Sequence, residues 1–373
     1  MSLPLKAPFV YFGGKSKVAP LVWSRFGCDC VNSVEPFFGS GAMLLGRPAP
    51  FTGSETVNDL DGLLANFWRA CAADPDAVAH HADWPVNEND LHARHIWLVG
   101  QKESLQARLE GDADFYDAKI AGWWCWGLNL WIGSGFCSGD GPWQIAEVDG
   151  TRQLVHLGNA GMGVNRKLVH LGNAGKGVNR QRVHLGDAGK GETASASEGL
   201  ERKRPVLAGA AGGFRLPDSD GIRDWMRTLA ERMRRVRVCC GDWERVCGPS
   251  VTFKHGLTAV FLDPPYADTA DRTANLYRKD CLDVAHRVRE WAIANGENPL
   301  MRICLCGYAG EHVMPANWEK VHWFARGGYS NQAKEQNDNR KKEMLYFSPF
   351  CQKPSDEFNF APEPTATTAL MDL

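Results

Sequence analysis

The chain has 373 residues, of which 44% are hydrophobic and 23% are charged, and its formal net charge is −2. A chain of this kind can bury one sizeable core and a smaller lobe, and its composition excludes a disordered or a membrane protein. No apolar run approaches the length of a membrane span or a signal segment, so we expect a cytoplasmic location. The twelve cysteines include no Cys-x-x-Cys pair, so we expect reduced thiols and no metal site.

An aromatic run near the start of the chain ends in two glycines and Lys15. Glycines let the backbone approach a ligand closely, and Lys15 places a cation beside it. Farther along, a short strand around Glu35 passes through Gly39 and Gly41 into a helical stretch at residues 42–45. Neither a phosphate-loop motif nor a full dinucleotide fingerprint is present, so this turn is not expected to hold a phosphate.

The next strand, residues 55–58, ends at Asp59. An acid at the end of the second strand, about twenty residues beyond a glycine turn, is placed to accept both hydroxyls of a ribose. The spacing therefore predicts Asp59 as a ribose ligand. Helices are predicted to follow at residues 61–73 and 89–108, where apolar residues recur at helical spacing.

Residues 123–136 hold four of the fourteen tryptophans and end in glycine and serine. Two interpretations of this segment are open. The tryptophans form either a stacking wall for a base that is turned out of a duplex, with a mobile glycine-rich tip, or a buried helix that ends in a Gly-Ser turn.

Residues 155–191 form an internal repeat with a period of fourteen residues, in which a histidine recurs. So much glycine cannot bury enough apolar area to fold alone, although residues 155–157 alternate like a short strand. The histidines lack a companion pattern of cysteine or carboxylate, which argues against a metal site. Residues 151–205 hold ten Lys and Arg against four Asp and Glu, a net charge of +6, which predicts a flexible basic insert that attracts DNA. The alternative is a duplication without function.

An amphipathic helix is predicted over residues 222–234, with Asp220 as its N-cap. A strand at residues 236–240 follows and leads to Asp242. The apolar run at residues 260–262 predicts a buried strand, because it stops at two prolines that cannot extend a sheet ladder.

The residues Asp263, Pro264, Pro265 and Tyr266 follow this buried strand, at the edge where open α/β sheets bind ligands. Together they suit a flat base that bears an exocyclic amine. Asp263 can accept one N–H of the amine, the Pro264 carbonyl can accept the other, and the Tyr266 ring can stack on the base. For this tetrapeptide alone, a tight turn without function is the alternative.

The remaining elements are a helix, three strands and a proline-containing tail. The helix is predicted over residues 281–294, the strands over residues 301–306, 320–324 and 344–347, and the tail over residues 353–373. The tail is expected to be disordered.

The motifs Gly-Gly-Lys, Glu-Pro-Phe-Phe-Gly-Ser-Gly and Asp-Pro-Pro-Tyr occur in this order, which resembles the Dam-type DNA N6-adenine methyltransferases of bacteria and phages. The resemblance implies a Rossmann-like methyltransferase fold of the α/β class, in which a mostly parallel seven-stranded sheet has helices on both faces. It implies S-adenosylmethionine as the cofactor and methyl transfer to the N6 amine of an adenine flipped out of double-stranded DNA. A monomer or weak dimer that needs neither a membrane nor a metal is expected.

The same resemblance implies roles for individual residues. The catalytic residues would be Asp263, Pro264, Pro265 and Tyr266. The residues that hold the cofactor would be Tyr11, Phe12, Gly13, Lys15, Glu35, Pro36, Phe37, Gly39, Gly41, Asp59, Asp242 and Asp263. Among these, Asp242 is the candidate acceptor for the adenine amine of the cofactor.

The catalytic domain is expected in two parts, residues 1–109 and 218–352. A smaller DNA-recognition lobe would be inserted at residues 110–217 and would contain the flexible region 151–205. Dam-type relatives have an Asn- and Arg-containing stretch near the tryptophan segment, where this chain has Asn129 among tryptophans, so neither the recognised sequence nor a restriction partner is assigned.

Other functions stay open. A glutamine-methylating enzyme usually has Asn in place of Asp263, and an enzyme that methylates cytosine N4 has Ser there. A catalytically silent DNA-binding subunit is the alternative from a different class, against which Lys15, Asp59 and the intact residues 263–266 argue.

Overall fold

The computed structural model describes residues 5–9, 11, 14–48, 51–86, 88–131, 136–137, 143–148, 151–156, 218–265, 283–323 and 343–353. Three predicted site residues, Phe12, Gly13 and Tyr266, lie outside this part of the chain. The same holds for the repeat from residue 157 onward and for the tail beyond residue 353.

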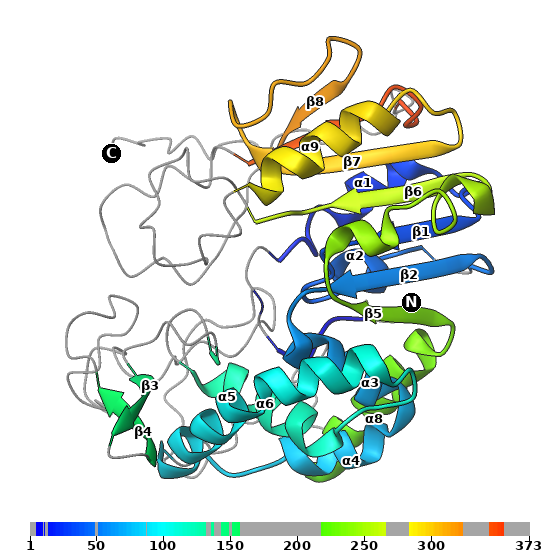
Figure 1. Cartoon of the computed structure of the whole chain (residues 1–373). Helices are drawn as coiled ribbons and strands as arrows, with labels where there is room; N and C mark the ends of the chain where they lie inside the picture. Colours follow the sequence, from blue (N-terminus) through cyan, green and yellow to red (C-terminus); the bar gives the residue numbers. More distant parts are fainter. Residues whose placement is uncertain are drawn as a thin grey trace, which may run out of the picture.

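Seven strands form one sheet in the order β5, β2, β1, β6, β7, β9, β8 (Figure 1). The strands are β1 (Asn32–Glu35), β2 (Ser54–Asp59), β5 (Val236–Cys240), β6 (Thr258–Leu262), β7 (Met301–Tyr308), β8 (Glu319–His322) and β9 (Glu343–Phe347). Neighbours from β5 to β7 pair in parallel, and β9 is antiparallel to both of its neighbours. The structure thus confirms an α/β fold with a mostly parallel seven-stranded sheet.

The helices connect these strands and cover the sheet. They are α1 (Ala19–Phe26), α2 (Ala42–Leu45), α3 (Gly62–Ala73), α4 (Pro75–Ala82), α5 (Glu88–Gly111), α6 (Ala118–Leu130), α8 (Asp218–Met233) and α9 (Val284–Asn295), with 3-10 turns η3 (Trp243–Val246) and η4 (Phe253–His255). The predicted bounds of α2 and β5 are confirmed to the residue. Helix α4 was not predicted, although Asp74 caps it and Pro75 opens it.

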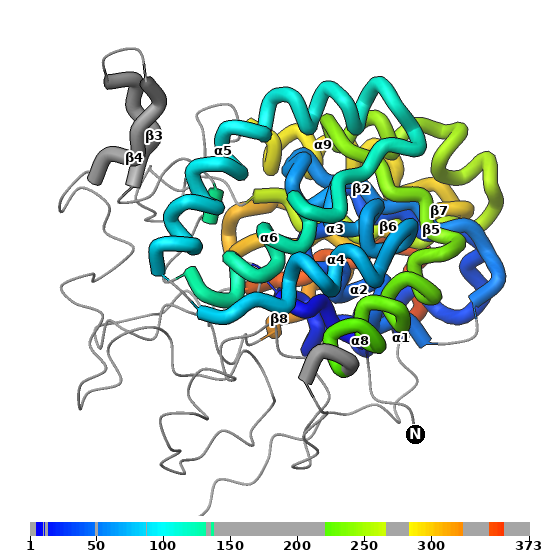
Figure 2. Tube along the Cα trace, turned by 90° about the horizontal axis from the view of Figure 1, so that it is seen from below, coloured from blue at the N-terminus to red at the C-terminus, as the bar shows by residue number. Residues whose placement is uncertain are grey.

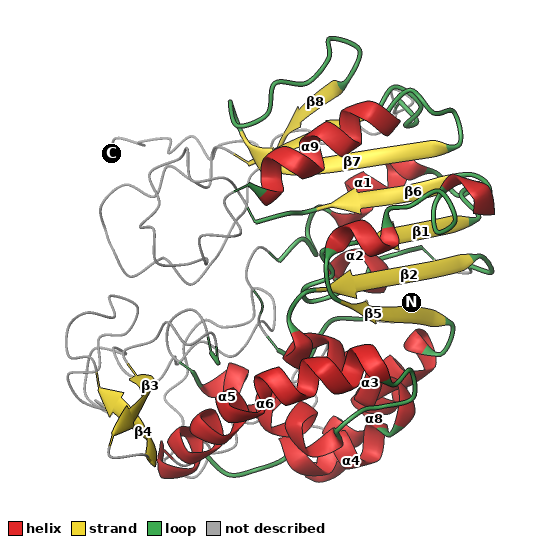
Figure 3. Cartoon of the chain, in the orientation of Figure 1, coloured by secondary structure: helices red, strands yellow, loops and turns green. Residues whose placement is uncertain are grey.

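The central strand β6 is buried on both faces, as its unbroken apolar sequence predicts. Ala259 and Phe261 join a core cluster with α1, whereas Val260 and Leu262 join a second cluster with α9. Because side chains alternate between the faces of a strand, α1 and α9 cover opposite faces of the sheet (Figure 3).

A third core cluster lies at the β5 end of the sheet, where α3, α4, α6 and α8 pack together (Figure 2). Trp124 of α6 belongs to this cluster, and Trp126 is also fully buried. The indole N–H of Trp126 donates to the Trp84 carbonyl at 2.9 Å. The buried-helix interpretation of the tryptophan segment therefore holds for α6, whereas residues 132–135 lie outside the described part.

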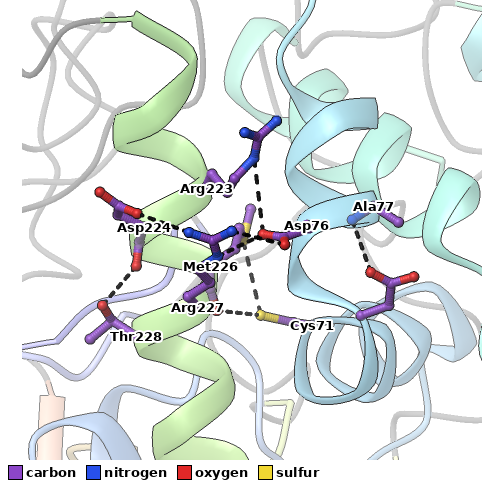
Figure 4. A network of polar contacts seen from close by, with 9 residues as sticks. Cys71, Asp76, Ala77, Arg223, Asp224, Met226, Arg227 and Thr228 are labelled. Atoms are coloured by element: carbon purple, nitrogen blue, oxygen red, sulfur yellow. Dashed lines mark hydrogen bonds and ion pairs between the residues drawn. The ribbon is translucent and has the colours of Figure 1, made fainter.

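Helix α8 is fastened to α3 and α4 by the polar contacts drawn in Figure 4. The guanidinium of Arg227 donates to both carboxylate oxygens of Asp76, at 2.8 and 3.0 Å, and the Cys71 thiol lies against Met226. The predicted N-cap at Asp220 is wrong, because the helix begins two residues earlier, at Asp218. Acidic residues are favourable anywhere in a first turn, so the cap could not be singled out from the sequence.

A separate two-stranded antiparallel sheet is formed by β3 (Trp143–Val148) and β4 (Thr151–His156). Residues 151–156, the first six residues of the region predicted to be flexible, thus form a strand. Residues 155 and 156 of the strand predicted at residues 155–157 are the end of β4, and residue 157 lies outside the described part of the chain. The signal that sequence reasoning missed is Asp149-Gly150, a dipeptide typical of hairpin turns, between two alternating runs.

The described cysteines are all free thiols and most are buried, as predicted. Among the described residues, no group of three or more His, Cys, Asp or Glu is placed to hold a metal ion. No helix in that part of the chain has the length and apolarity that crossing a membrane requires.

Candidate active site at the carboxyl edge of the sheet

The site lies where the order of the parallel strands across the sheet reverses, between β1 and β6. Strand β1 has β2 on one side and β6 on the other, so the connections leaving these strands diverge and open a crevice at their carboxyl ends. Val34 pairs with Val260 in parallel register, which brings the residues after Glu35 beside Asp263 at one edge. The sequence-based placement of Asp263 at the end of a buried strand is confirmed.

A small pocket with a cavity volume of about 30 Å³, partly open to solvent, occupies this crevice. It is lined by Lys15, Glu35, residues 37–40, Ala42, Met43, Phe261 and Asp263. Residues from all three sequence motifs therefore meet around one pocket.

The glycine turn between β1 and α2 needs its glycines. Gly39 and Gly41 have φ angles of +51° and +67°, in the left-handed region that other residues avoid. A Cβ on Gly41 would lie 2.7 Å from the Phe38 ring, and one on Gly39 would lie 3.2 Å from the ring of Tyr11. The turn therefore needs glycine at both positions, and at Gly39 the backbone itself borders the pocket beside Phe38 and Ser40.

Asp59, at the end of β2, holds this turn in place. One of its carboxylate oxygens accepts the Gly39 N–H at 2.9 Å and the other accepts the Asp61 N–H at 3.0 Å. Burial raises the pKa of Asp59 to about 6, although these N–H groups oppose the rise. Asp59 thus lies at the carboxyl end of β2 but does not line the pocket, and each of its two oxygens accepts a backbone N–H of the fold.

Lys15 is a buried cation at the centre of the edge. Its ammonium lies 2.9 Å from a carboxylate oxygen of Asp263, 3.8 Å from Glu343 and 5.9 Å from the centre of the Trp323 ring. Burial alone would lower the Lys15 pKa, but Asp263 and Glu343 outweigh it, and the pKa is raised above its usual value. Lys15 is therefore an ammonium that orients Asp263.

Glu35 is a buried acid at the end of β1 that also lines the pocket. Burial and the nearby Glu55 raise its pKa to about 8, and Arg232 and Arg47 act against this rise. Its Oε1 atom is buried and has no hydrogen-bond partner among the described residues. An oxygen of this kind favours a ligand that brings a hydrogen-bond donor or a positive charge.

The other predicted site residues lie at varying distances from the pocket. The Pro36 carbonyl accepts from the Asn58 amide at 3.1 Å, Pro264 is buried and Pro265 is half-buried. Asp242 is exposed, and one of its oxygens caps η3 through the Glu244 N–H at 2.8 Å. It does not line the pocket.

Two residues beside Lys15 were missed by sequence reasoning. Glu343 begins β9, whose antiparallel direction brings its first residue to the carboxyl edge, and Trp323 follows β8 at the same edge. The sequence marks Glu343 only as an acidic residue at the start of a buried strand. It does not predict that β9 runs antiparallel to its neighbours, and this direction is what brings Glu343 to the site.

No protein-family model matches the sequence, and a comparison with curated proteins gives no match either. The chemistry of the site must therefore be inferred from its own residues.

Proposed function

We propose that the protein transfers a methyl group from S-adenosylmethionine to the N6 amine of adenine in DNA, as the resemblance to Dam-type enzymes implies. The observation that carries this proposal is the pocket in which Lys15, the glycine turn after Glu35 and Asp263 meet. These residues come from three separate stretches of sequence. Because they line one pocket at the carboxyl ends of the strands, we infer that they bind the same ligand.

The strand order supports the finer fold assignment. With the seven strands of the large sheet counted in chain order, the order across the sheet is 3-2-1-4-5-7-6. This is the doubly wound Rossmann order 3-2-1-4-5-6 with one antiparallel strand inserted before the last. A Rossmann-like methyltransferase fold, with the cofactor at the switch between β1 and β6, accounts for this topology.

The residues present fit the cofactor. The unpartnered Oε1 of Glu35 suits the ammonium of its amino-acid part, the backbone at Gly39 is open to contact from the pocket, and Asp59 at the end of β2 suits the ribose hydroxyls. When bound, the cofactor supplies an electrophilic methyl on a sulfonium sulfur, which leaves as a thioether when a nitrogen takes the methyl.

The task of the protein is then to hold the amine. With one oxygen on Lys15, Asp263 has its second oxygen for an N–H of the base, and the Pro264 carbonyl can accept the other N–H. Hydrogen bonds of this kind favour a nitrogen whose lone pair points at the methyl group, and orientation supplies much of the catalysis. Because the amine attacks the methyl group directly, no covalent enzyme intermediate is needed. The methylated nitrogen then loses its extra proton.

The test is methyl transfer to unmethylated DNA, followed by mass spectrometry of its nucleosides. N6-methyladenine is expected with the parent protein and none with Asp263→Ala, which should still bind the cofactor. Arg227→Gln, a change on the exposed side of α8, serves as the control. N4-methylcytosine would move the assignment to the cytosine enzymes. DNA binding without any transfer by the parent would favour the silent subunit.

A further inference from the structure

The side chain of Asn58, near the end of β2, joins the turns that follow the strands on either side of it. Strand β2 lies between β5 and β1 in the sheet, and Asn58 is only 1% exposed. Its amide donates to the Pro36 carbonyl after β1 at 3.1 Å and to the Gly241 carbonyl after β5 at 2.9 Å. Both N–H groups of the amide are thus used, and one side chain connects the ends of three neighbouring strands.

The contacts of Asn58 lie on both sides of a residue that lines the pocket. The Asn58 carbonyl accepts the Phe38 N–H at 2.9 Å, while its amide holds the Pro36 carbonyl. Phe37, between these two, lines the pocket, and its ring stacks on that of Trp243 with the ring centres 6.2 Å apart. Because Trp243 follows the turn after β5, a shift of one turn against the other would move a wall of the pocket.

Asparagine is the side chain of this size that can make both hydrogen bonds. Aspartate has the same shape but no N–H to donate, and leucine has a similar volume and no polar atom. Either replacement would leave two buried carbonyls without this donor, which favours a separation of the turns that admits water. The Oδ1 atom of Asn58 is buried and has no hydrogen-bond partner among the described residues, so the two donated bonds are what the amide contributes.

We infer that Asn58 is a positioning residue of the cofactor pocket: it fixes the distance between the glycine turn, which the amino-acid part of the cofactor would meet, and the turn at Gly241 and Asp242, which its adenosine part would meet. The inference rests on the proposed function for the identity of the ligand. Asn58 does not line the pocket, and its effect passes through Pro36 and Gly241. A ligand that spans both turns should therefore depend on Asn58 more than a ligand that occupies one of them.

The experiment compares the parent with Asn58→Leu and Asn58→Ser, and with Asn32→Leu as the matched control. Asn32 is also 1% exposed, and its amide also donates twice, to the Val251 carbonyl at 2.8 Å and to the Thr258 hydroxyl at 3.0 Å. It begins β1 and therefore lies at the opposite, amino edge of the sheet.

Two measurements are needed. The first is hydrogen exchange of residues 37–41 and 241–247 in the ligand-free protein, followed by mass spectrometry. The second is calorimetric affinity for S-adenosylhomocysteine, which would span both turns, and for 5′-methylthioadenosine, which lacks the amino-acid part.

Asn58→Leu should speed the exchange of both segments by about five- to tenfold, the effect expected when a buried hydrogen bond is lost. The affinity for S-adenosylhomocysteine should fall by a similar factor, about five- to tenfold. The affinity for 5′-methylthioadenosine should change by less than about twofold, because the parallel pairing of β2 with β5 remains. Asn58→Ser should change these quantities in the same direction but less. Asn32→Leu should lower the melting temperature and leave the exchange of both segments and both affinities as in the parent.

Exchange of the two segments that is the same in Asn58→Leu and the parent would overturn the inference. So would equal losses of affinity for the two ligands, which is the signature of a general structural role, or an equal loss in Asn32→Leu. If Asn58→Leu does not fold, the same comparison with Asn58→Ser decides the matter. A parent that binds neither ligand would refute the proposed function, while the exchange measurement would still test the tie between the two turns.

Discussion

Replacing Lys15 with methionine would remove the cation that joins three elements at the carboxyl edge of the sheet. The Lys15 ammonium lies 2.9 Å from Asp263 and 3.8 Å from Glu343, and only 4% of its side chain is exposed. Methionine has a similar shape, so the change removes a charge with little loss of packing. Two neighbouring carboxylates then remain without this cation.

The size of the effect follows from the geometry. Coulomb's law gives about 6 kcal/mol for unit charges 2.9 Å apart at an effective dielectric constant of about 20. The cost of burying both charges offsets much of this attraction, and 19% of the Asp263 side chain is exposed, so we expect a net coupling of about 2–3 kcal/mol. Because the Lys15 pKa is raised, this stabilisation is fully present below pH 10.5 and is lost as the pH rises through the folded-state pKa.

A double-mutant cycle with Lys15→Met and Asp263→Asn, measured by urea unfolding at pH 7, isolates this coupling. Lys15→Met should lower the free energy of unfolding by about 3 kcal/mol, and the double variant should lose less than the two single changes together. Lys17→Met, which removes an exposed lysine two positions away, is the control. A coupling below about 0.5 kcal/mol would refute the reasoning, because the pair would then behave like a surface ion pair.

Three further predictions follow from the site and the fold. Asp59→Ala should weaken S-adenosylmethionine binding by about 2 kcal/mol in calorimetry, and more than Asp59→Asn does; unchanged affinity would contradict the ribose role. Burial lowers the pKa of His312 to about 4, so its contribution to stability is present above pH 6.5 and is lost as the pH falls toward 4. The melting temperature of His312→Phe should accordingly fall less steeply with falling pH than that of the parent over this range. If the two melting temperatures fall in parallel, His312 is not a source of the acid sensitivity. Deleting residues 157–191, which keeps β4 intact, should flatten the fall of DNA affinity with salt and leave the melting temperature nearly unchanged, whereas a collapsed melting temperature would show that these residues belong to the folded core.

The buried strands β6 and β7 could be predicted because each holds an apolar run with a clear end. Strand β6 ends at Leu262, just before Asp263 and two prolines, and β2 ends at Asp59. The end of a parallel strand also locates a site, since all such ends meet at one edge of the sheet. For this reason Glu35, Asp59 and Asp263 could be picked out from the sequence and lie at one edge in the structure.

The charge partners of these residues could not be predicted in the same way. Arg232 and Glu55 are 177 positions apart, and nothing in either neighbourhood marks them as a pair. The tryptophan helix α6 was ambiguous for a different reason. A helix with large apolar residues on every side can be core or can be a stacking surface, and only the packing of Trp124 against α3 and α4 decides between them.

The two pocket carboxylates differ in how their charge is compensated, and this separates their tasks. Asp263 has an ammonium 2.9 Å away that orients it, whereas no ion pair to Glu35 is found among the described residues, and Arg232 and Arg47 only partly offset the burial of its charge. A pair of acids in such different surroundings responds differently to the same ligand. Asp263 is oriented before any ligand arrives and suits an amine that must be held in one geometry. Burial raises the pKa of Glu35 to about 8, so this acid gains most when a cation enters the pocket, as the ammonium of the proposed cofactor would.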